Sequence, residues 1–381
     1  MRAPFGPLLL ASLTAACAAQ APAATPSGTD GPALPARFDA AAIDAYVAAQ
    51  VKDRKIVGAQ LVIARDGEVV LSRAYGLSSL ATRAPVTPDT AFGIGSVTKQ
   101  FICAAALLLE DDGKLSLDDR VAAHYPDLTR AADIRLDDLG GHLSGYPDYY
   151  PLDYVDRRMR QPTTPDEVIR KYATGALEFE PRTRYSYSNT GFLVLGRVVE
   201  KVSGQTLGDF LRQRVFAPLG MTRSGFGAPG TAGALDQPFG HWSRSLGFDP
   251  VRPESDDADI PAAVGPAGNV HATLADYALF MQAHIAGARG VSGLLSADSF
   301  QTLQRRIVSN YALGWFTQPF PTLGVDGLTH SGSTLRWFSL VALAPTLNEG
   351  VMIATNGGGE RGAEAVSALE RLLAKRVAAS I

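Results

Sequence analysis

The chain has 381 residues, of which 46% are hydrophobic and 19% are charged. This apolar content suffices for a sizeable core and excludes a chain that is disordered throughout. Lys and Arg number 35 against 38 Asp and Glu, which gives a net charge of -3 with no long block of either sign. Because binding to a phosphate backbone needs a concentrated basic face, the composition excludes nucleic acid as a partner.

The N-terminal residues predict export. Arg2 supplies a positive charge, and the apolar stretch Phe5–Ala16 is too short to span a bilayer. We expect a signal peptide over residues 1–21 and then a flexible linker, rich in Ala, Pro and Gly, over residues 22–37. Leu13–Ala16 resembles a bacterial lipoprotein box, so ordinary cleavage nearby and a lipid anchor at Cys17 both stay open. In either case we expect an exported protein, periplasmic or lipid-anchored in the bacterial envelope.

The sequence offers little to a metal ion or a nucleotide. Besides Cys17 there is one cysteine, Cys103, so we expect neither an internal disulfide nor a cysteine-based zinc site. The six His residues show no metal-binding spacing, and no glycine-rich nucleotide motif follows a strand pattern. We therefore expect no metal and no cofactor.

The first predicted elements are a helix, a hairpin and a second helix. Apolar residues at helical spacing predict a helix over Asp39–Lys52. The segments Gln60–Arg65 and Glu68–Arg73 flank Asp66-Gly67, a turn pair that tolerates positive φ, and so predict a β-hairpin. The next helix covers Ser96–Asp112, and its Ala- and Leu-rich body is apolar nearly all round, which predicts a central, buried position.

The middle of the chain is mostly helix and loop by pattern, and β-patterns return near the end. Helices are predicted at Thr164–Tyr172, Asn189–Val202, Leu207–Val215, Thr273–Ala286 and Arg361–Ala378, and strands at Tyr311–Trp315, Phe338–Leu343 and Gly350–Thr355. The sequence thus predicts an α/β fold of the α+β type. Its antiparallel sheet and flanking helices come from residues 38–113 and 290–381, and residues 114–289 form an inserted, mostly helical subdomain.

Three short motifs carry groups suited to chemistry. Ser96–Lys99 has the form Ser-x-x-Lys at a helix start, where positions i and i+3 share a face and bring an amine beside a hydroxyl. Tyr187–Asn189 places a phenol and an amide on one side of an extended stretch. His330–Gly332 precedes Ser333 between β-patterns, where a strand edge offers N–H groups to an oxyanion. Taken singly, each motif also has a structural explanation: a helix cap, a packed tyrosine or a strand-end turn.

In this order, the three motifs resemble those of the active-site serine β-lactamase and penicillin-binding-protein superfamily. The similarity is to its class C β-lactamase-like, D-alanyl-D-carboxypeptidase and esterase branch. Further segments that look like blocks of this family are Phe92–Phe101, Gly113–Val121, Leu139–Gly145, Tyr187–Phe192, Phe216–Met221, Pro266–Thr273 and Tyr311–Trp315. The resemblance covers essentially the whole mature chain and implies a β-lactamase/transpeptidase-like catalytic domain over residues 38–381.

The resemblance also implies a role for each motif residue. Ser96 is expected to be the acylated nucleophile, and Lys99 and Tyr187 to share the general base and acid work. Asn189 is expected to orient the lysine and the substrate amide. The backbone N–H groups of Ser96 and Ser333 would form the oxyanion hole.

Other conspicuous residues receive weaker assignments. In this family His142 looks structural, and Ser144 lacks the nucleophile elbow of an α/β-hydrolase. Cys103 and Trp315 are expected to be core residues. A mostly aromatic loop either walls the substrate cleft or packs between the subdomains; it comprises Tyr146, Asp148, Tyr149, Tyr150 and Tyr154.

The chain departs from the class C β-lactamase pattern at His330–Gly332, where those enzymes carry Lys-Thr-Gly to bind a substrate carboxylate. A His of ordinary pKa near 6.5 is mostly neutral at pH 7 and gains charge as the pH falls through that value. With His330, Ser331, Gly332 and Ser333 as substrate-binding residues, we expect a peptidase, amidase or esterase whose partner is a small-molecule or peptide substrate. A β-lactamase proper, and a non-catalytic envelope protein that binds peptidoglycan-like ligands in the same cleft, are the alternatives.

Overall fold

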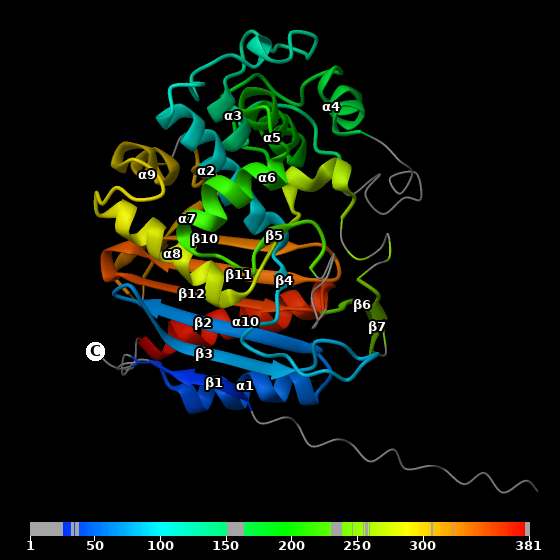
Figure 1. The fold of residues 1–381 in the computed structure, drawn as a ribbon, viewed down its shortest axis with the longest axis vertical. Coiled ribbons are helices and arrows are strands. Elements are labelled where there is room, and N and C mark those ends of the chain that lie inside the picture. Colours follow the sequence, from blue (N-terminus) through cyan, green and yellow to red (C-terminus); the bar gives the residue numbers. More distant parts are fainter. Residues whose placement is uncertain are drawn as a thin grey trace, which may run out of the picture.

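The structure is a computed structural model that describes residues 26–31, 34, 38–150, 164–229, 238–245, 247–253, 255, 258, 260–305, 308–321 and 323–377. The predicted signal peptide, Cys17, Tyr154 and Ala378 lie outside the described residues. The largest sheet contains β1 (Ser27–Asp30), β2 (Gly58–Arg65), β3 (Glu68–Gly76), β9 (Phe316–Phe320), β10 (Val325–Ser333), β11 (Phe338–Ala344) and β12 (Glu349–Thr355). These seven strands are antiparallel, in the order β1-β3-β2-β12-β11-β10-β9 (Figure 1). The predicted α+β fold is confirmed.

Both faces of this sheet are covered. Leu61 and Ile63 of β2 belong to the cluster under α1 (Ala40–Lys52) and α10 (Gly359–Val377). Val62 and Ala64 belong to the cluster that contains α2 (Thr98–Asp111) and α8 (Leu274–Ala288). Since side chains alternate across a strand, a strand covered on both faces is expected to be mostly apolar, which explains the continuous apolar run Leu61–Ala64 of β2.

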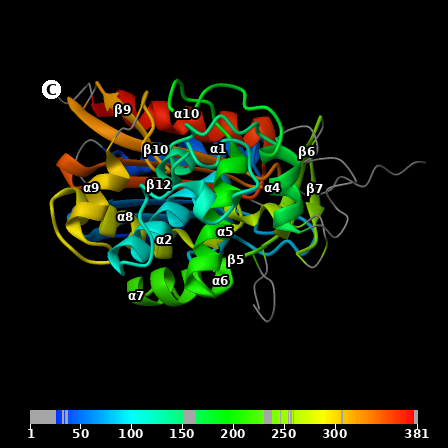
Figure 2. The same ribbon diagram turned by 90° about the horizontal axis from the view of Figure 1, so that it is seen from above.

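The helical part of the molecule lies beyond the β10 side of the sheet (Figure 1). It contains α3 (Leu136–Gly140), α4 (Pro165–Ala173), α5 (Asn189–Ser203), α6 (Leu207–Leu211), α7 (Ala217–Leu219) and α9 (Ala297–Gln304). Figure 2 shows α6 and α7 on the opposite side of the molecule from α10. The helix α2 is buried from Thr98 to Leu109, as its apolar sequence predicts.

Two small sheets complete the fold. The strands β4 (Phe92–Gly93) and β5 (Gly225–Phe226) both pair with β8 (Val270–Ala272). The strands β6 (Gly240–Arg244) and β7 (Gly247–Val251) form a separate hairpin. Because β4 ends just before Ser96, its pairing with β8 anchors the chain immediately ahead of the first motif.

Local sequence signals locate several predicted elements well. The Asp39 side chain caps α1 by accepting from the N–H of Ala42 at 2.9 Å, and Thr164 forms a capping box with Glu167 at the start of α4. The hairpin of β2 and β3 turns at Asp66 and Gly67, which have φ values of 52° and 84°. Both φ values are positive, as a type I′ turn requires and as the Asp-Gly pair predicts.

The predicted strand Tyr311–Trp315 is wrong, because β9 begins only at Phe316. The backbone turns at Gly314, which has a φ of 77°. A Cβ at this glycine would lie 3.0 Å from the backbone of Gln100, so the segment packs closely against the start of α2 instead of extending the sheet. Trp315 is fully buried, as expected.

Two domain expectations also need correction. Ser27–Asp30, within the predicted flexible linker, forms the edge strand β1, which pairs with β3 and is held by an ion pair between Asp30 and Arg73 at 2.5 Å. The helix α8, within the predicted helical insertion, packs on the sheet. The N–H of Leu274 at its first residue donates to Gln60 Oε1 of β2 at 3.2 Å, so the sheet layer takes in part of the inserted sequence.

The last residues of β10 approach the turn that precedes α2. The strand β9 pairs with β10 only as far as Thr329, whereas β11 pairs with it to Ser333. Beyond Thr329, β10 lies beside the turn at Ile94, and a Cβ at Gly332 would overlap the carbonyl oxygen of Ile94. The same carbonyl oxygen accepts a hydrogen bond from Ser339 Oγ at 2.8 Å. The contact between β10 and the Ile94 turn therefore requires glycine.

We predict that Gly332→Ala lowers the free energy of unfolding by about 1–3 kcal/mol, because the added methyl must push the turn away from the strand. The measurement is chemical denaturation, with Gly293→Ala as the matched control, since nothing lies within 4 Å of a Cβ there. Equal stability of the two variants would contradict the close approach.

Candidate active site

Ser96 lies in a short turn of 3-10 helix, Gly95–Val97, directly before α2. The predicted helix therefore starts two residues later than expected. Gly95 has a φ of +55°, and Thr98 Oγ1 accepts from the N–H of Val270 at 2.9 Å, which ties the start of α2 to β8. Ser96 is half-buried, so its hydroxyl stands at the border between the core and solvent.

Lys99 is buried completely, with its amine next to Ser96. Its Nζ lies 3.1 Å from Ser96 Oγ, 2.8 Å from Asn189 Oδ1 and 2.8 Å from the carbonyl oxygen of Ala267. Burial lowers the pKa of Lys99 to about 7, against an opposing effect of the Asp148 charge. A substantial share of the amine is thus neutral near pH 7 and able to accept a proton.

Tyr187 contacts the same hydroxyl from another direction. Its phenol donates to Ser96 Oγ at 2.9 Å, and its ring centroid lies 4.3 Å from that of His142. Burial raises the pKa of Tyr187, partly offset by the hydrogen bond to Ser96. Desolvation is the largest of these influences on the phenol. The phenol keeps its proton near pH 7 and is suited to donate it.

Asn189 is the first residue of α5 and joins two charged groups. Its Oδ1 accepts from Lys99, while its Nδ2 donates to Asp148 Oδ1 at 3.2 Å and Oδ2 at 3.1 Å. Its backbone N–H also donates to Asp148 Oδ1, at 3.0 Å. The structure thus places Asn189 where the sequence expected it, beside the lysine. Sequence reasoning missed the role of Asp148, whose one signal was an acidic residue within an aromatic loop.

The two halves of the expected oxyanion hole meet at the glycines described above. A Cβ at Gly95 would lie 2.5 Å from the backbone nitrogen of Ser333, and one at Gly332 would lie 2.8 Å from that of Ser96. The N–H groups of Ser96 and Ser333 are therefore neighbours on facing segments. Ser331 and Ser333 are exposed on one face of β10, whereas Gly332 is buried on the other.

His330 differs from the expectation of a titrating, substrate-facing imidazole. It is 3% exposed, and burial followed by the charge of Lys99 lowers its pKa to about 3. Its Nδ1 lies 2.6 Å from the carbonyl oxygen of Ser331, which can only accept, so Nδ1 carries the proton. Nε2 then accepts from the hydroxyl of Tyr311 at 3.1 Å. His330 therefore stays neutral as the pH falls through 6.5, and that earlier expectation is wrong.

The remaining candidates have packing roles in the structure. His142 is 1% exposed, its Nδ1 accepts from the N–H of Ser188 at 3.0 Å, and burial lowers its pKa. Ser144 is 1% exposed and Cys103 is also buried, as expected of core residues. The Tyr146 hydroxyl donates to the carbonyl oxygen of Thr129 at 3.0 Å. This contact lies within the predicted helical subdomain, so both interpretations of the aromatic loop remain predictions.

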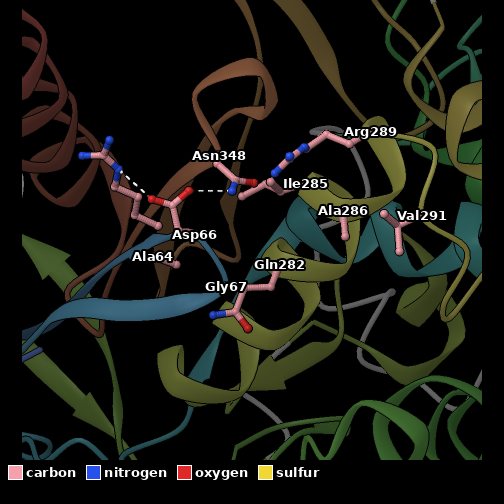
Figure 3. A pocket seen from close by; sticks show the side chains of 10 residues that line it. Ala64, Asp66, Gly67, Gln282, Ile285, Ala286, Arg289, Val291 and Asn348 are labelled. Carbon is pink, nitrogen blue, oxygen red and sulfur yellow. Dashed lines mark hydrogen bonds and ion pairs between the residues drawn. The ribbon is translucent and has the colours of Figure 1, made fainter. Parts of the chain in front are cut away.

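A separate pocket of about 350 Å³ lies at the other end of the sheet strands (Figure 3). Its walls include the β2–β3 turn at Asp66 and the β11–β12 connection at Asn348, whose Nδ2 donates to Asp66 Oδ1 at 2.6 Å. The connection of β10 and β11, beside Ser333, lies at the opposite end of β11. The motif residues and this pocket are therefore distinct places in the fold.

Within the described part of the chain, no group of three or more His, Cys, Asp or Glu residues could hold a metal ion. None of the described helices is both long enough and apolar enough to cross a bilayer.

The lowered pKa of Lys99 predicts a pH-dependent stability. Between pH 7 and the ordinary value of 10.5, the unfolded chain binds more protons at this lysine than the folded chain. The free energy of unfolding of the wild type should therefore rise with pH relative to Lys99→Met, by on the order of 2 kcal/mol from pH 6 to pH 9. Urea unfolding of both proteins at the two pH values measures this. A constant difference would show that the lysine titrates normally.

Comparisons with known proteins identify similar sequences. The Beta-lactamase family profile matches residues 43–375. A D-aminopeptidase from Brucella anthropi is 36% identical over 192 residues, which cover 49% of this chain and 36% of that protein. Penicillin-binding protein 4 from Amycolatopsis lactamdurans is 29% identical over 327 residues, 80% of this chain and 82% of the relative. An unguisins hydrolase from Aspergillus campestris is 29% identical over 335 residues, 82% of this chain and 61% of the relative.

Solved structures show the same fold. An octameric penicillin-binding protein homologue from Pyrococcus abyssi superposes with a TM-score of 0.74 at 26% identity, covering 88% of this chain and 78% of that one. A class C β-lactamase superposes with a TM-score of 0.72 at 18% identity, covering 89% and 95%. The chain spans less than two thirds of the D-aminopeptidase and of the unguisins hydrolase. By the family match over most of its length, the chain belongs to the β-lactamase family.

Proposed function

We propose that this protein is an exported serine hydrolase that forms an acyl-enzyme on Ser96. One observation carries the proposal: Ser96 Oγ lies within hydrogen-bond distance of both the Lys99 amine, at 3.1 Å, and the Tyr187 phenol, at 2.9 Å. A structural serine at a helix start needs neither partner. A hydroxyl between a proton acceptor and a proton donor is the arrangement that covalent catalysis requires.

The opposite pKa shifts of the two partners divide the proton transfers between them. Neutral Lys99 takes the proton of Ser96 as Oγ bonds to the substrate carbonyl carbon, and the carbonyl electron pair moves to its oxygen. The N–H groups of Ser96 and Ser333 stabilise that oxyanion. When the tetrahedral intermediate collapses, the leaving group takes the proton of Tyr187, which Lys99 restores. Water then attacks the acyl-enzyme by the reverse sequence and frees Ser96.

The substrate class follows from the charge at β10. His330 is neutral and buried, so this strand presents no fixed cation where class C enzymes bind a carboxylate. We infer a preference for esters or amides without a carboxylate at this position, including D-amino-acid peptides. The relative named D-aminopeptidase supports this class. A β-lactamase proper is the second candidate, favoured by the family match.

The first prediction concerns the nucleophile. Ser96→Ala should abolish covalent labelling by a fluorophosphonate, because no hydroxyl remains between Lys99 and Tyr187. The readout is intact mass with peptide mapping, and Ser144→Ala, which removes a buried hydroxyl, serves as the control and should label normally. Label retained in Ser96→Ala would refute the nucleophile, and no label in the wild type would favour the non-catalytic envelope protein.

The second prediction concerns substrate choice. The wild type should show a higher kcat/KM for p-nitrophenyl butyrate than for nitrocefin, and the ratio should not change between pH 8 and pH 5.5 because His330 stays neutral. The side chain in His330→Lys is longer than the buried imidazole, and a cation that it extends to the substrate should move the ratio toward nitrocefin by about ten- to a hundredfold, since a charge-assisted contact contributes about 1.5–3 kcal/mol. A wild type that turns over nitrocefin faster, with a ratio insensitive to His330→Lys, would favour a β-lactamase proper.

A further inference from the structure

Asp148 lies in the loop that follows α3, and its carboxylate faces the start of α5. It accepts three hydrogen bonds from Asn189, one from the backbone N–H and two from the side-chain amide, at 3.0–3.2 Å. The N–H of Tyr150 also donates to Oδ1, at 3.2 Å. The backbone N–H of Asn189 is one of the groups that α5 itself leaves unpaired, so the carboxylate also caps this helix.

This set of bonds determines which way the Asn189 amide points. A carboxylate can only accept hydrogen bonds, so Asp148 selects the NH₂ end of the amide. The Oδ1 end is then turned toward Lys99 Nζ, 2.8 Å away. If the amide were reversed, its NH₂ group would face the N–H groups of Lys99, so that donor would oppose donor. Its oxygen would face the carboxylate of Asp148, so that acceptor would oppose acceptor. One rotatable amide is thus held in the orientation that the lysine requires.

The same carboxylate affects the charge on Lys99. Burial lowers the pKa of Lys99, and the Asp148 charge is the largest opposing influence. The titratable and polar groups around the amine come from several elements: Ser96, Cys103, His142, Tyr187, Asn189 and His330. Burial lowers the pKa values of both imidazoles and raises those of the thiol and the phenol, so these four groups are neutral near pH 7.

We propose that Asp148 is a positioning residue of the active site: it locks the Asn189 amide toward Lys99 and, by its negative charge, sets the pH at which that lysine becomes a base. This proposal rests on the proposed acyl-enzyme function. Asp148 does not touch the reacting atoms and acts only through Asn189 and its field. Removal of the Asp148 carboxylate should therefore change both the rate of acylation and the dependence of that rate on pH.

The test is the rate of fluorophosphonate labelling of the full chain as a function of pH. In Asp148→Asn, the midpoint of the acidic limb should fall by about 1 pH unit, because the lysine loses its nearby negative charge. The plateau rate should also fall, since the new amide no longer selects the orientation of Asn189. Asp326→Asn removes an equal charge from the far, exposed end of β10 and should change neither quantity.

A conservative variant separates the two roles. Asp148→Glu keeps the charge but changes the reach, so it should retain the wild-type midpoint and lower the plateau. A wild-type midpoint in Asp148→Asn, or a wild-type plateau in Asp148→Glu, would overturn the proposal, and the second result applies even if Asp148→Asn does not fold. If instead the wild type is not labelled at Ser96, the proposed function itself fails.

Discussion

The site depends on keeping an amine out of water. Lys99 is fully buried, yet its Nζ lies within reach of three oxygen atoms, from the turn before α2, from α5 and from the segment that contains Ala267. Burying an unpaired ammonium would cost several kcal/mol, so these acceptors are a condition of the fold and of the chemistry together. The segments that carry these three acceptors must therefore be packed together before the lysine can be buried.

This burial also separates the proton affinities of the two groups beside Ser96. Desolvation disfavours whichever form is charged, so it lowers the pKa of an amine and raises that of a phenol. Lys99 and Tyr187 share one low-dielectric environment, and their pKa values are shifted in opposite directions, down for the amine and up for the phenol. A base and an acid suited to neutral pH thus result from one physical effect acting on two different side chains.

Much of this architecture follows from local sequence. The apolar periodicity of α1 and α5, the Asp66-Gly67 turn and the all-round apolar α2 identify elements whose packing agrees with their own propensities. The prediction of a strand at Tyr311–Trp315 failed because the segment packs against the start of α2. An apolar segment that packs in this way has the same sequence pattern as a buried strand. The burial of His330 and the bonds of Asp148 were out of reach, since each depends on segments far away in the chain that pattern reasoning does not bring together.

The pairing of β2 with β12 constrains the order in which the protein can fold. The hairpin of β2 and β3 forms early in the chain, but the neighbour of β2 in the sheet is Glu349–Thr355, almost at the opposite terminus. Such pairings close very long loops and are slow to form. During synthesis, the apolar β2 has no partner on that side until residues 349–355 have been made. Over that period the apolar β2 strand is an unpaired edge, which is the kind of surface through which incompletely folded chains aggregate.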